Sequence, residues 1–381
     1  MLLALVGFMR KITPFAPSIL VFFVLTLLNP AHFTCAAGTE NETDSVEQRR
    51  SGLLLLPIFF YTPETEIAGG AAVMYYFRES GSKPSSRPSS ILPSVIYTQN
   101  KQIMAELSTY LYWKDEEYYS EGYLAYIKFP AKFYGIGNNT KEDDEEDYTP
   151  RFVRLDLSFQ KRVRSGLYLG MRYELERRKL TEVAEGGLLA RGDILGSEGG
   201  IASGAGILAS WDSRNQVYSP SSGAYHHASA TFFKSALGSD YDFNRYEVDL
   251  RQYFPLSSSH VIAFQGYART ITGHPPFQMV SLLGGQNMMR GYYEGRYRDK
   301  DMIVFQSEYR MPVWWRFGLV GFAGFGDVAE EFSDLKLSSF KYSLGAGIRY
   351  LFSPEERINL RLDFGFGQGT SGLYITMNEA F

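Results

Sequence analysis

The sequence predicts an all-β protein, a transmembrane antiparallel β-barrel of about 16 strands. The chain carries 27 Tyr, 28 Phe and 37 Gly, a mixture that suits strands and tight turns better than helices. From Leu53 onward, segments of about 9 to 14 residues alternate between apolar and polar positions, with turn residues between them. Many of the polar positions carry charges of both signs, which indicates a barrel whose outer face meets lipid and whose interior is wet.

Residues 1–37 have the pattern of a secretory signal peptide. Arg10 and Lys11 precede an apolar run from Ile19 to Leu28, and small residues follow up to Ala37. An anchoring helix is the alternative, but the run is about half of the roughly 20 residues that a membrane span needs. We therefore predict export, with cleavage near Ala37.

The rest of the chain divides into a short lead and the barrel. Residues 38–52 are polar and acidic without a period, which predicts a short disordered lead, and residues 53–381 form the predicted barrel. Export followed by a barrel implies the outer membrane of a Gram-negative cell. Cys35 is the only cysteine. The mature chain is therefore expected to hold no disulfide and no thiolate metal site.

Two segments near the end show the predicted faces most clearly. In 340–352, one face is apolar, with Phe340, Tyr342, Leu344, Ala346, Ile348, Tyr350 and Phe352, and the other carries Lys341, Ser343, Gly345, Gly347 and Arg349. In 358–367, the apolar face has Ile358, Leu360, Leu362, Phe364 and Phe366, and the other has Asn359, Arg361, Asp363, Gly365 and Gly367. A soluble sandwich also alternates, but its strands are shorter and its polar face points outward.

Counting such segments gives an even number, as bacterial barrels require. The expected strands are 53–61, 66–78, 89–99, 101–113, 116–129, 150–162, 165–180, 197–212, 222–234, 241–254, 259–273, 301–313, 316–328, 340–352, 356–367 and 372–381. Long loops belong outside and short turns at the periplasmic rim. This rule places the acidic stretch 130–150 and the stretch 182–196 outside, and the Trp314–Trp315 turn at the rim, where aromatic residues form an interfacial girdle.

The stretch Gly284–Arg298 concentrates charge and aromatic rings in one outer loop. It carries three arginines and three tyrosines. Cations fixed in such a loop need acidic partners, and the next two predicted strands offer Glu308 and Asp327. Strict alternation places Asp327 on the face of Phe325, so a bulge near Gly324 or Gly326 is needed to turn it inward.

These residues resemble the Omp85 superfamily, in its bacterial surface antigen D15 barrel, which outer-membrane assembly factors and two-partner secretion pores share. Met289-Arg290-Gly291-Tyr292 is similar to the family's Arg-Gly-aromatic tip on the sixth outer loop. Ser307–Pro312 is similar to its Glu-aromatic-Arg-x-Pro strand, and Gly324–Asp327 to its aromatic-x-Asp strand. Phe381 resembles the terminal aromatic by which outer-membrane barrels are recognised for assembly.

The resemblance implies that the sixth outer loop folds back into the lumen and is held there. The lumen loop lock would consist of Arg290, Gly291, Tyr292, Glu308 and Asp327, with Arg290 paired to both acids. One departure concerns the substrate-receiving POTRA domains, because the short lead cannot hold one.

Several functions remain open from the sequence. The first is a non-enzymatic barrel that assists insertion or translocation of protein or lipid, with outer-membrane lipid, unfolded outer-membrane or secreted proteins, and a separate periplasmic partner as partners. The second is a passive pore or structural barrel. A barrel-embedded enzyme is third, since no Ser, His and acid constellation stands out. No polybasic run supports nucleic acid as a partner, and no catalytic, cofactor or metal site is expected.

Overall fold

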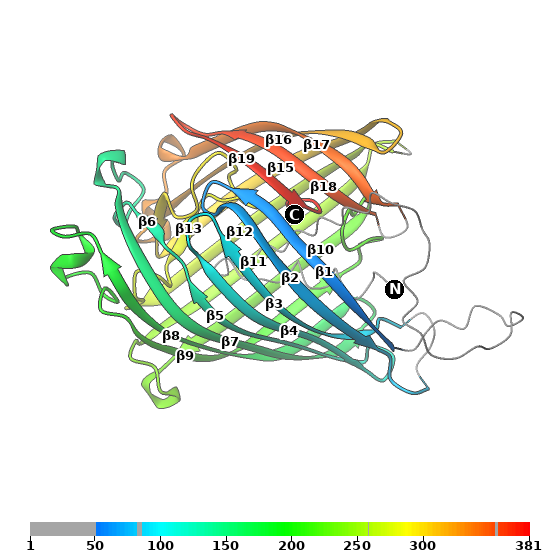
Figure 1. The fold of residues 1–381 in the computed structure, drawn as a ribbon, viewed down its shortest axis with the longest axis horizontal. Coiled ribbons are helices and arrows are strands. Elements are labelled where there is room, and N and C mark those ends of the chain that lie inside the picture. Colours follow the sequence, from blue (N-terminus) through cyan, green and yellow to red (C-terminus); the bar gives the residue numbers. More distant parts are fainter. Residues whose placement is uncertain (1–50, 82–85, 258, 355–356) are drawn as a thin grey trace, which may run out of the picture.

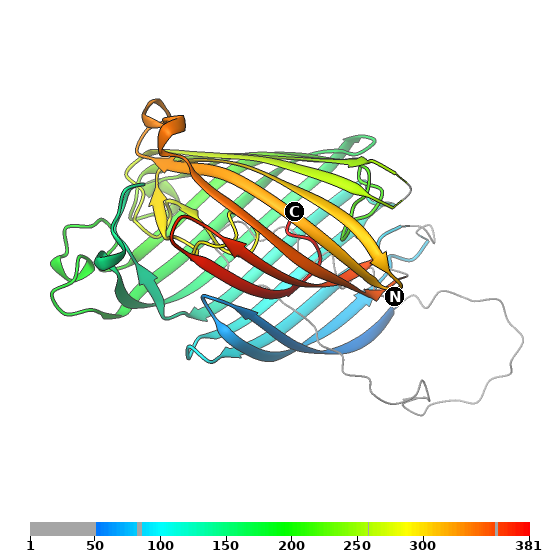
Figure 2. The ribbon, with the colours of Figure 1, turned by 90° about the horizontal axis from the view of Figure 1, so that it is seen from above.

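The computed structural model describes residues 51–81, 86–257, 259–354 and 357–381. It confirms the predicted fold, a closed antiparallel barrel of 16 strands (Figures 1 and 2). The predicted signal peptide and residues 38–50 of the predicted lead lie outside the described residues. Ser51 and Gly52, placed in the lead by the sequence, already belong to the first strand.

The strands follow one another around the barrel in chain order. Their bounds are β1 Ser51–Thr62, β2 Glu66–Phe77, β3 Ser89–Thr98, β4 Ile103–Trp113, β5 Tyr118–Lys128, β7 Glu146–Arg164, β8 Leu167–Val183, β9 Gly200–Asp212, β10 Gly223–Phe233, β11 Phe243–Pro255, β12 Val261–Gly273, β15 Asp301–Trp314, β16 Phe317–Ala329, β17 Lys341–Ser353, β18 Ile358–Phe366 and β19 Ser371–Met377.

Shorter elements lie in the loops. They are β6 Ala131–Phe133, which pairs with β7, the hairpin of β13 Ser281–Leu283 and β14 Tyr297–Asp299, and the 3-10 turns η2 Glu142–Asp144, η3 Leu189–Arg191, η4 Ser235–Leu237, η5 Phe332–Asp334 and η6 Leu337–Ser339. None of the described residues belongs to a helix that is long and apolar enough to cross a membrane.

The largest difference from the expected strand starts is in β7, which begins at Glu146 rather than at residue 150. Proline usually ends a strand because it lacks an amide hydrogen. Here the pairing of β7 with β8 shifts register between Thr149 and Pro150, so the strand continues past the proline.

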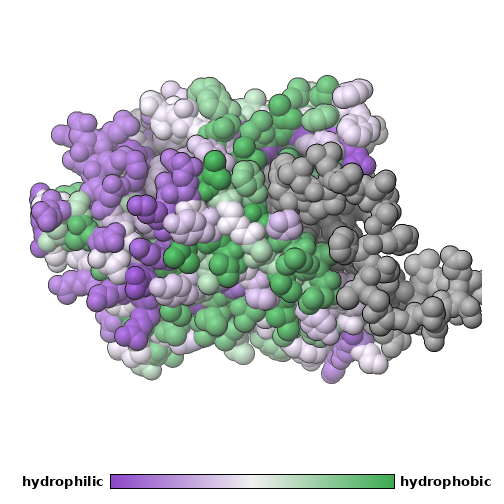
Figure 3. Space-filling model, in the orientation of Figure 1, coloured by the Kyte–Doolittle hydropathy of each residue, from purple (hydrophilic) through white to green (hydrophobic). Residues whose placement is uncertain are grey.

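The outer face of the barrel carries the apolar half of each alternating pattern. Along β17, Tyr342, Leu344 and Ile348 are exposed, whereas Ser343 and Arg349 are buried. Figure 3 shows a hydrophobic band across the middle of the molecule, with hydrophilic residues gathered at the end that carries the outer loops. This distribution matches a strand barrel whose central belt faces lipid.

The lumen wall is charged over most of its circumference but apolar along the first strands, whereas the sequence predicts a wet interior. Most lumen-facing residues of β1 and β2 are apolar and buried, among them Ile58, Phe60 and Met74. On β4, Met104 shares the inner face with buried Glu106 and Ser108. The wall from β7 to β12 instead carries paired charges, such as Arg269 Nη2 at 2.6 Å from Glu247 Oε2. The alternation within a strand predicts which side chains point inward, but it does not predict how apolar and charged side chains are distributed around the lumen.

The barrel closes between its first and last strands, at the junction that we call the seam. Through the seam β1 and β19 share one register pair, Tyr61 with Ile375. By comparison, β1 pairs with β2 at twelve positions and β18 pairs with β19 at seven. The seam is therefore the least extensively paired junction between neighbouring barrel strands among the described residues.

The end of the chain differs from the predicted last strand, 372–381. β19 ends at Met377, and Asn378 has a left-handed φ of 63° that turns the chain away from the strand. Phe381 is buried beside Tyr253 and Ala263 in the lumen, and Figure 2 shows the C-terminus within the length of the barrel. The apolar alternation ends at Met377, as the observed strand does, but the expected strand extends to Phe381.

Candidate functional site

The loop between β12 and β15 is the candidate site. The small hairpin of β13 and β14 forms its neck, since Ser281 pairs with Asp299 and Leu283 pairs with Tyr297. Beyond the neck, the tip returns toward lumen-facing side chains of β15, β17, β18 and β19. Positive φ angles at Met289 (51°) and Gly291 (113°) produce the sharp turn around Arg290.

Arg290 is buried between two carboxylates from different strands. Its Nη2 lies 2.6 Å from Glu308 Oε1 on β15, and its Nη1 donates to Asp363 on β18. Arg290 is 2% exposed and both acids are 0% exposed. The guanidinium also stacks 3.6 Å from the ring centroid of Phe322. A planar fork that meets two carboxylates and an aromatic face uses properties that lysine lacks.

The expected partner Asp327 does not pair with Arg290, and Asp363 takes its place. The pairing of β15 with β16 shows no register shift near Gly324 or Gly326, so the bulge that would turn Asp327 inward does not form. Asp327 is opposite Ile303, five residues from the level of Phe322 and Glu308, which corresponds to roughly 17 Å along a strand. It accepts hydrogen bonds from Asn138 and Ser339 of other outer loops.

The Arg290 pair belongs to a larger buried network. Its members are the arginines Arg290, Arg310, Arg349 and Arg361 and the carboxylates Glu308, Asp363 and Glu379. Glu379 comes from the inward-turned end of the chain, and its Oε2 lies 2.8 Å from Arg349 Nε. Four guanidinium groups thus face three side-chain carboxylates, so the network has no spare acid.

Glycines on β18 allow the loop tip to lie directly on the barrel wall. A Cβ atom on Gly365 would lie 2.6 Å from the carbonyl carbon and oxygen of Arg290, and one on Gly367 would lie 2.5 Å from the ring of Tyr292. Both distances are shorter than van der Waals contact, so these two positions exclude larger side chains. The sequence shows both glycines on the polar face of this strand, but only the fold shows what lies against them.

Tyr292 and Gly291 add contacts to the last strands. The hydroxyl of Tyr292 donates to the carbonyl of Tyr342 at 3.0 Å, and it accepts from the amide of Gln368 at 2.8 Å. The amide of Gly291 donates to the hydroxyl of Tyr374, on β19, at 3.0 Å. Tyr374 is fully buried. The Arg-Gly-Tyr tip therefore contacts the three strands that end the barrel.

A second acidic contact joins the loop to the first hairpin of the barrel. The amide of Glu294 donates to Oε1 of Glu64, in the turn between β1 and β2, at 2.9 Å. Burial raises the pKa of Glu294 to about 8, and the nearby carboxylate of Glu64 raises it further whereas Arg298 opposes the shift. Burial also raises the pKa of Glu64, against hydrogen bonds that lower it.

Docking of the loop is accordingly expected to weaken as pH rises. A carboxyl whose pKa is higher in the docked state binds its proton more tightly there, so docking is strongest below the ordinary value of 4.5 and declines until about pH 8. The hydrogen-exchange protection factors of the loop amides, measured from pH 5 to 9 and corrected for the intrinsic exchange rate at each pH, should fall over this range. The variant Glu294→Gln should flatten the profile, and an identical slope in that variant would contradict the assignment.

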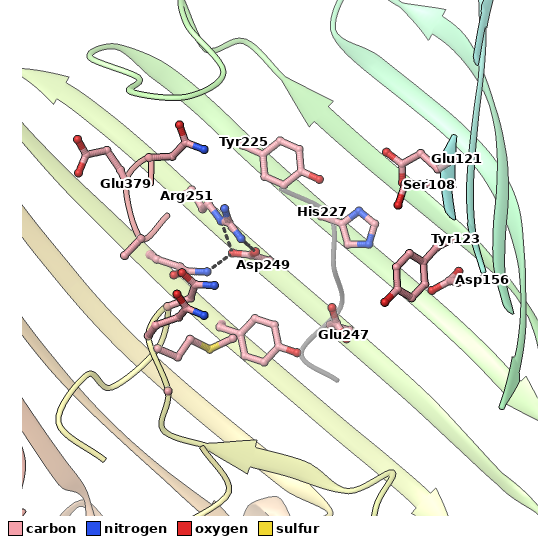
Figure 4. A pocket seen from close by; sticks show the side chains of 18 of the residues that line it. Ser108, Glu121, Tyr123, Asp156, Tyr225, His227, Glu247, Asp249, Arg251 and Glu379 are labelled. Carbon is pink, nitrogen blue, oxygen red and sulfur yellow. Dashed lines mark hydrogen bonds and ion pairs between the residues drawn. The ribbon is translucent and has the colours of Figure 1, made fainter. Parts of the chain in front are cut away.

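A polar pocket lies in the lumen beside the loop (Figure 4). Figure 4 shows Tyr225, His227 and Glu247 on its wall, and Asp249 bound by Arg251. Arg251 Nε donates to both oxygens of Asp249 at 3.1 and 3.0 Å. Within the described part of the chain, no group of three or more His, Cys, Asp or Glu side chains could hold a metal ion.

Sequence reasoning found Arg290, Gly291, Tyr292 and Glu308 but missed their other partners. The missed residues are Arg349, Arg361, Asp363, Gly365, Gly367, Tyr374 and Glu379. Five of these were already visible as the polar faces of two predicted strands. Which of those polar residues meets the loop depends on the stagger between strands, and alternation within one strand carries no such information.

Comparison with known proteins supplies a family and a fold. Residues 96–381 match the Omp85 superfamily domain. The structure is similar to BamA from Haemophilus ducreyi lacking POTRA domains 1–3, with a TM-score of 0.61 and 13% identity, covering 86% of this chain and 70% of that one. It is also similar to CdiB from Acinetobacter baumannii (TM-score 0.53, 11% identity, 86% and 59% covered).

CdiB from Escherichia coli gives a TM-score of 0.55 at 8% identity, covering 86% of this chain and 62% of that one. The chain thus spans about three fifths of either CdiB structure. At these identities the likeness establishes the fold. No curated protein sequence matches the chain.

Proposed function

Because the chain belongs to the Omp85 superfamily, we propose that it is a non-enzymatic outer-membrane barrel that assists insertion or translocation of protein, or of lipid, through its seam. The Arg290 loop is proposed to act as a lumen lock that keeps the barrel closed in the resting state. Arg290, Gly291, Tyr292 and Glu308 have this role in the proposal, with Asp363 in the place expected for Asp327.

The observation that carries the proposal is the weak closure of the seam. β1 and β19 share a single register pair, whereas β1 pairs with β2 at twelve positions. A sparsely paired strand edge is the kind of edge that accepts an added strand. β1 also exposes Leu53, Leu55 and Phe59 toward the membrane, so an incoming strand would find lipid on one side.

The proposal implies particular partners and a location. The apolar belt supports contact with membrane lipid, and we propose outer-membrane lipid in particular. The sparsely paired junction between β1 and β19 suits an unfolded outer-membrane or secreted protein in extended form. A separate periplasmic partner that delivers such a substrate is part of the proposal.

A seam that can be locked covalently tests this function. Residues opposite each other in an antiparallel pair have Cα atoms about 4.5 to 5.5 Å apart, within the range that a disulfide spans. Vesicles that contain the Tyr61→Cys, Ile375→Cys variant should speed the folding of a urea-unfolded outer-membrane barrel protein when reduced and lose this effect when oxidised. The matched control is Val248→Cys, Ala268→Cys, which staples β11 to β12 away from the seam.

Equal acceleration in the oxidised seam variant would reject the seam as the working element, and no acceleration by wild-type vesicles would reject the assembly function. The alternative is a passive pore, which the polar lumen wall and its pocket favour. A passive pore should conduct steadily whether the seam is locked or not. Conductance that is independent of seam oxidation, without folding activity, would therefore support that alternative.

A further inference from the structure

The arginine loop contacts the barrel on both sides of the seam. On one side, the amide of Gly291 donates to the hydroxyl of Tyr374, and that hydroxyl lies 3.4 Å from the carbonyl of Tyr292. Tyr374 directly precedes Ile375, the β19 member of the single seam pair. On the other side, the amide of Glu294 donates to Glu64, three residues after Tyr61, the β1 member of that pair.

The short segment between these two contacts is braced internally. The amide of Gly285 donates to the carbonyl of Tyr292 at 2.9 Å, and the amide of Gly295 donates to the carbonyl of Leu283 at 3.0 Å. The hairpin of β13 and β14 closes the base of the same loop. Residues 291–294 are therefore expected to move as one unit, so that a shift of Tyr374 also shifts the contact with Glu64.

The turn that carries Glu64 is itself anchored. The carbonyl of Glu64 accepts from Gln102 Nε2 at 2.8 Å and from Asn100 Nδ2 at 3.0 Å, both from the turn between β3 and β4. The hydroxyls of Thr62 and Thr65 bond each other at 2.9 Å across the turn. Because these bonds fix the turn, Glu64 is expected to move together with the whole hairpin of β1 and β2.

We propose that residues 291–294 form a staple across the outer end of the seam, with Tyr374 and Glu64 as its two anchor residues. Loop docking and seam closure are then one coupled equilibrium. Since coupling is reciprocal, opening the seam weakens docking of the loop to the same extent that docking favours a closed seam. The staple matters here because the seam has only one register pair of its own. This inference rests on the proposed function only in taking the seam as the part that moves.

The first test measures the width of the seam directly. Spin labels are placed at Phe59→Cys on β1 and Leu373→Cys on β19, two lipid-facing positions that are 39% and 38% exposed, in a Cys35→Ser background of the full chain. Distance distributions are compared for wild type, Tyr374→Phe, Glu64→Ala and the double variant. Each single variant is expected to raise the ratio of open to closed seam roughly 2- to 12-fold, the change that one hydrogen bond of typical net strength provides.

The double variant distinguishes a staple from two unrelated contacts. A bridge fails when either end is released, so the double variant should open the seam no further than the stronger single variant. Matched controls are Tyr342→Phe, whose side chain is exposed on the outer face, and Glu185→Ala in an exposed outer loop. Unchanged distributions in the single variants, or effects that multiply in the double variant, would overturn the proposal.

A second test leaves both anchors intact and so does not depend on the folding of the anchor variants. Oxidation of the Tyr61→Cys, Ile375→Cys pair should slow hydrogen exchange at the amides of Gly291 and Glu294, which are the donors of the staple. The Val248→Cys, Ala268→Cys control should leave both rates unchanged. Equal exchange with the seam locked and unlocked would reject the coupling. Neither test uses a folding substrate, so a failed assembly assay with positive results here would reject the proposed function and keep the staple.

Discussion

Replacement of Asp363 with asparagine is expected to destabilise the barrel by about 3 to 5 kcal/mol, the usual cost of stranding a buried charge. Asp363 accepts from Arg290 and Arg349 and lies 3.4 Å from Arg361 Nε. Without its charge, four arginines would face two carboxylates in a fully buried site. The temperature at which the folded form loses its compact migration in detergent gels measures this cost.

The control and a partial rescue make this prediction specific. Asp193→Asn changes the same residue type in an exposed loop and should leave the transition unchanged. Adding Arg361→Gln to Asp363→Asn leaves three arginines and two carboxylates, so the excess of positive charge falls from two to one. The double variant should therefore recover part of the lost stability. A transition for Asp363→Asn equal to that of Asp193→Asn would mean that the network does not hold the barrel together.

Replacement of Arg290 with alanine is expected to have the largest effect on conductance. The remaining network then has three arginines and three carboxylates, so the stability cost should be smaller than for Asp363→Asn. The loop, however, loses its only side chain that reaches both Glu308 and Asp363. In planar bilayers we expect wild type to be quiet and Arg290→Ala to conduct strongly and noisily.

Two further variants separate the loss of the lock from the loss of charge. Gly365→Ala keeps every charge but places a Cβ atom 2.6 Å from the main chain of Arg290, and it should release the tip and raise conductance in the same way. Arg191→Ala removes an exposed arginine from another outer loop and should stay quiet. A wild type that already conducts steadily, unchanged by Arg290→Ala, would leave a passive pore as the better account.

The strands were predictable because lipid imposes a strict local rule. Each strand must present apolar side chains to the membrane at every second position, so segments such as 340–352 show their faces without reference to any neighbour. The observed β17, Lys341–Ser353, differs from this expectation by one residue at each end. The bulge at Pro150 could not be predicted, because it depends on how β7 lies against β8.

The site was predictable only in part. The Arg-Gly-Tyr tip and Glu308 carry recognisable sequence patterns, whereas Asp363 does not. Asp327 fitted the pattern better but lies at a different level of the barrel, where it accepts from Asn138 and Ser339. Asp363 reaches Arg290 because the registers of β16, β17 and β18 bring it to the level of Arg310, only two residues along the strand from Glu308.

The sequence by itself determined the fold class, the number of barrel strands and the loop that carries Arg290, because each depends on local alternation and on a short motif. The tertiary structure alone decided the partner of Arg290, the inward turn that brings Glu379 into the network, and the contacts of the loop with Tyr374 and Glu64. These contacts join residues far apart in the chain. Their pairing depends on strand stagger and on the closure of the barrel, which are global properties that no single segment encodes.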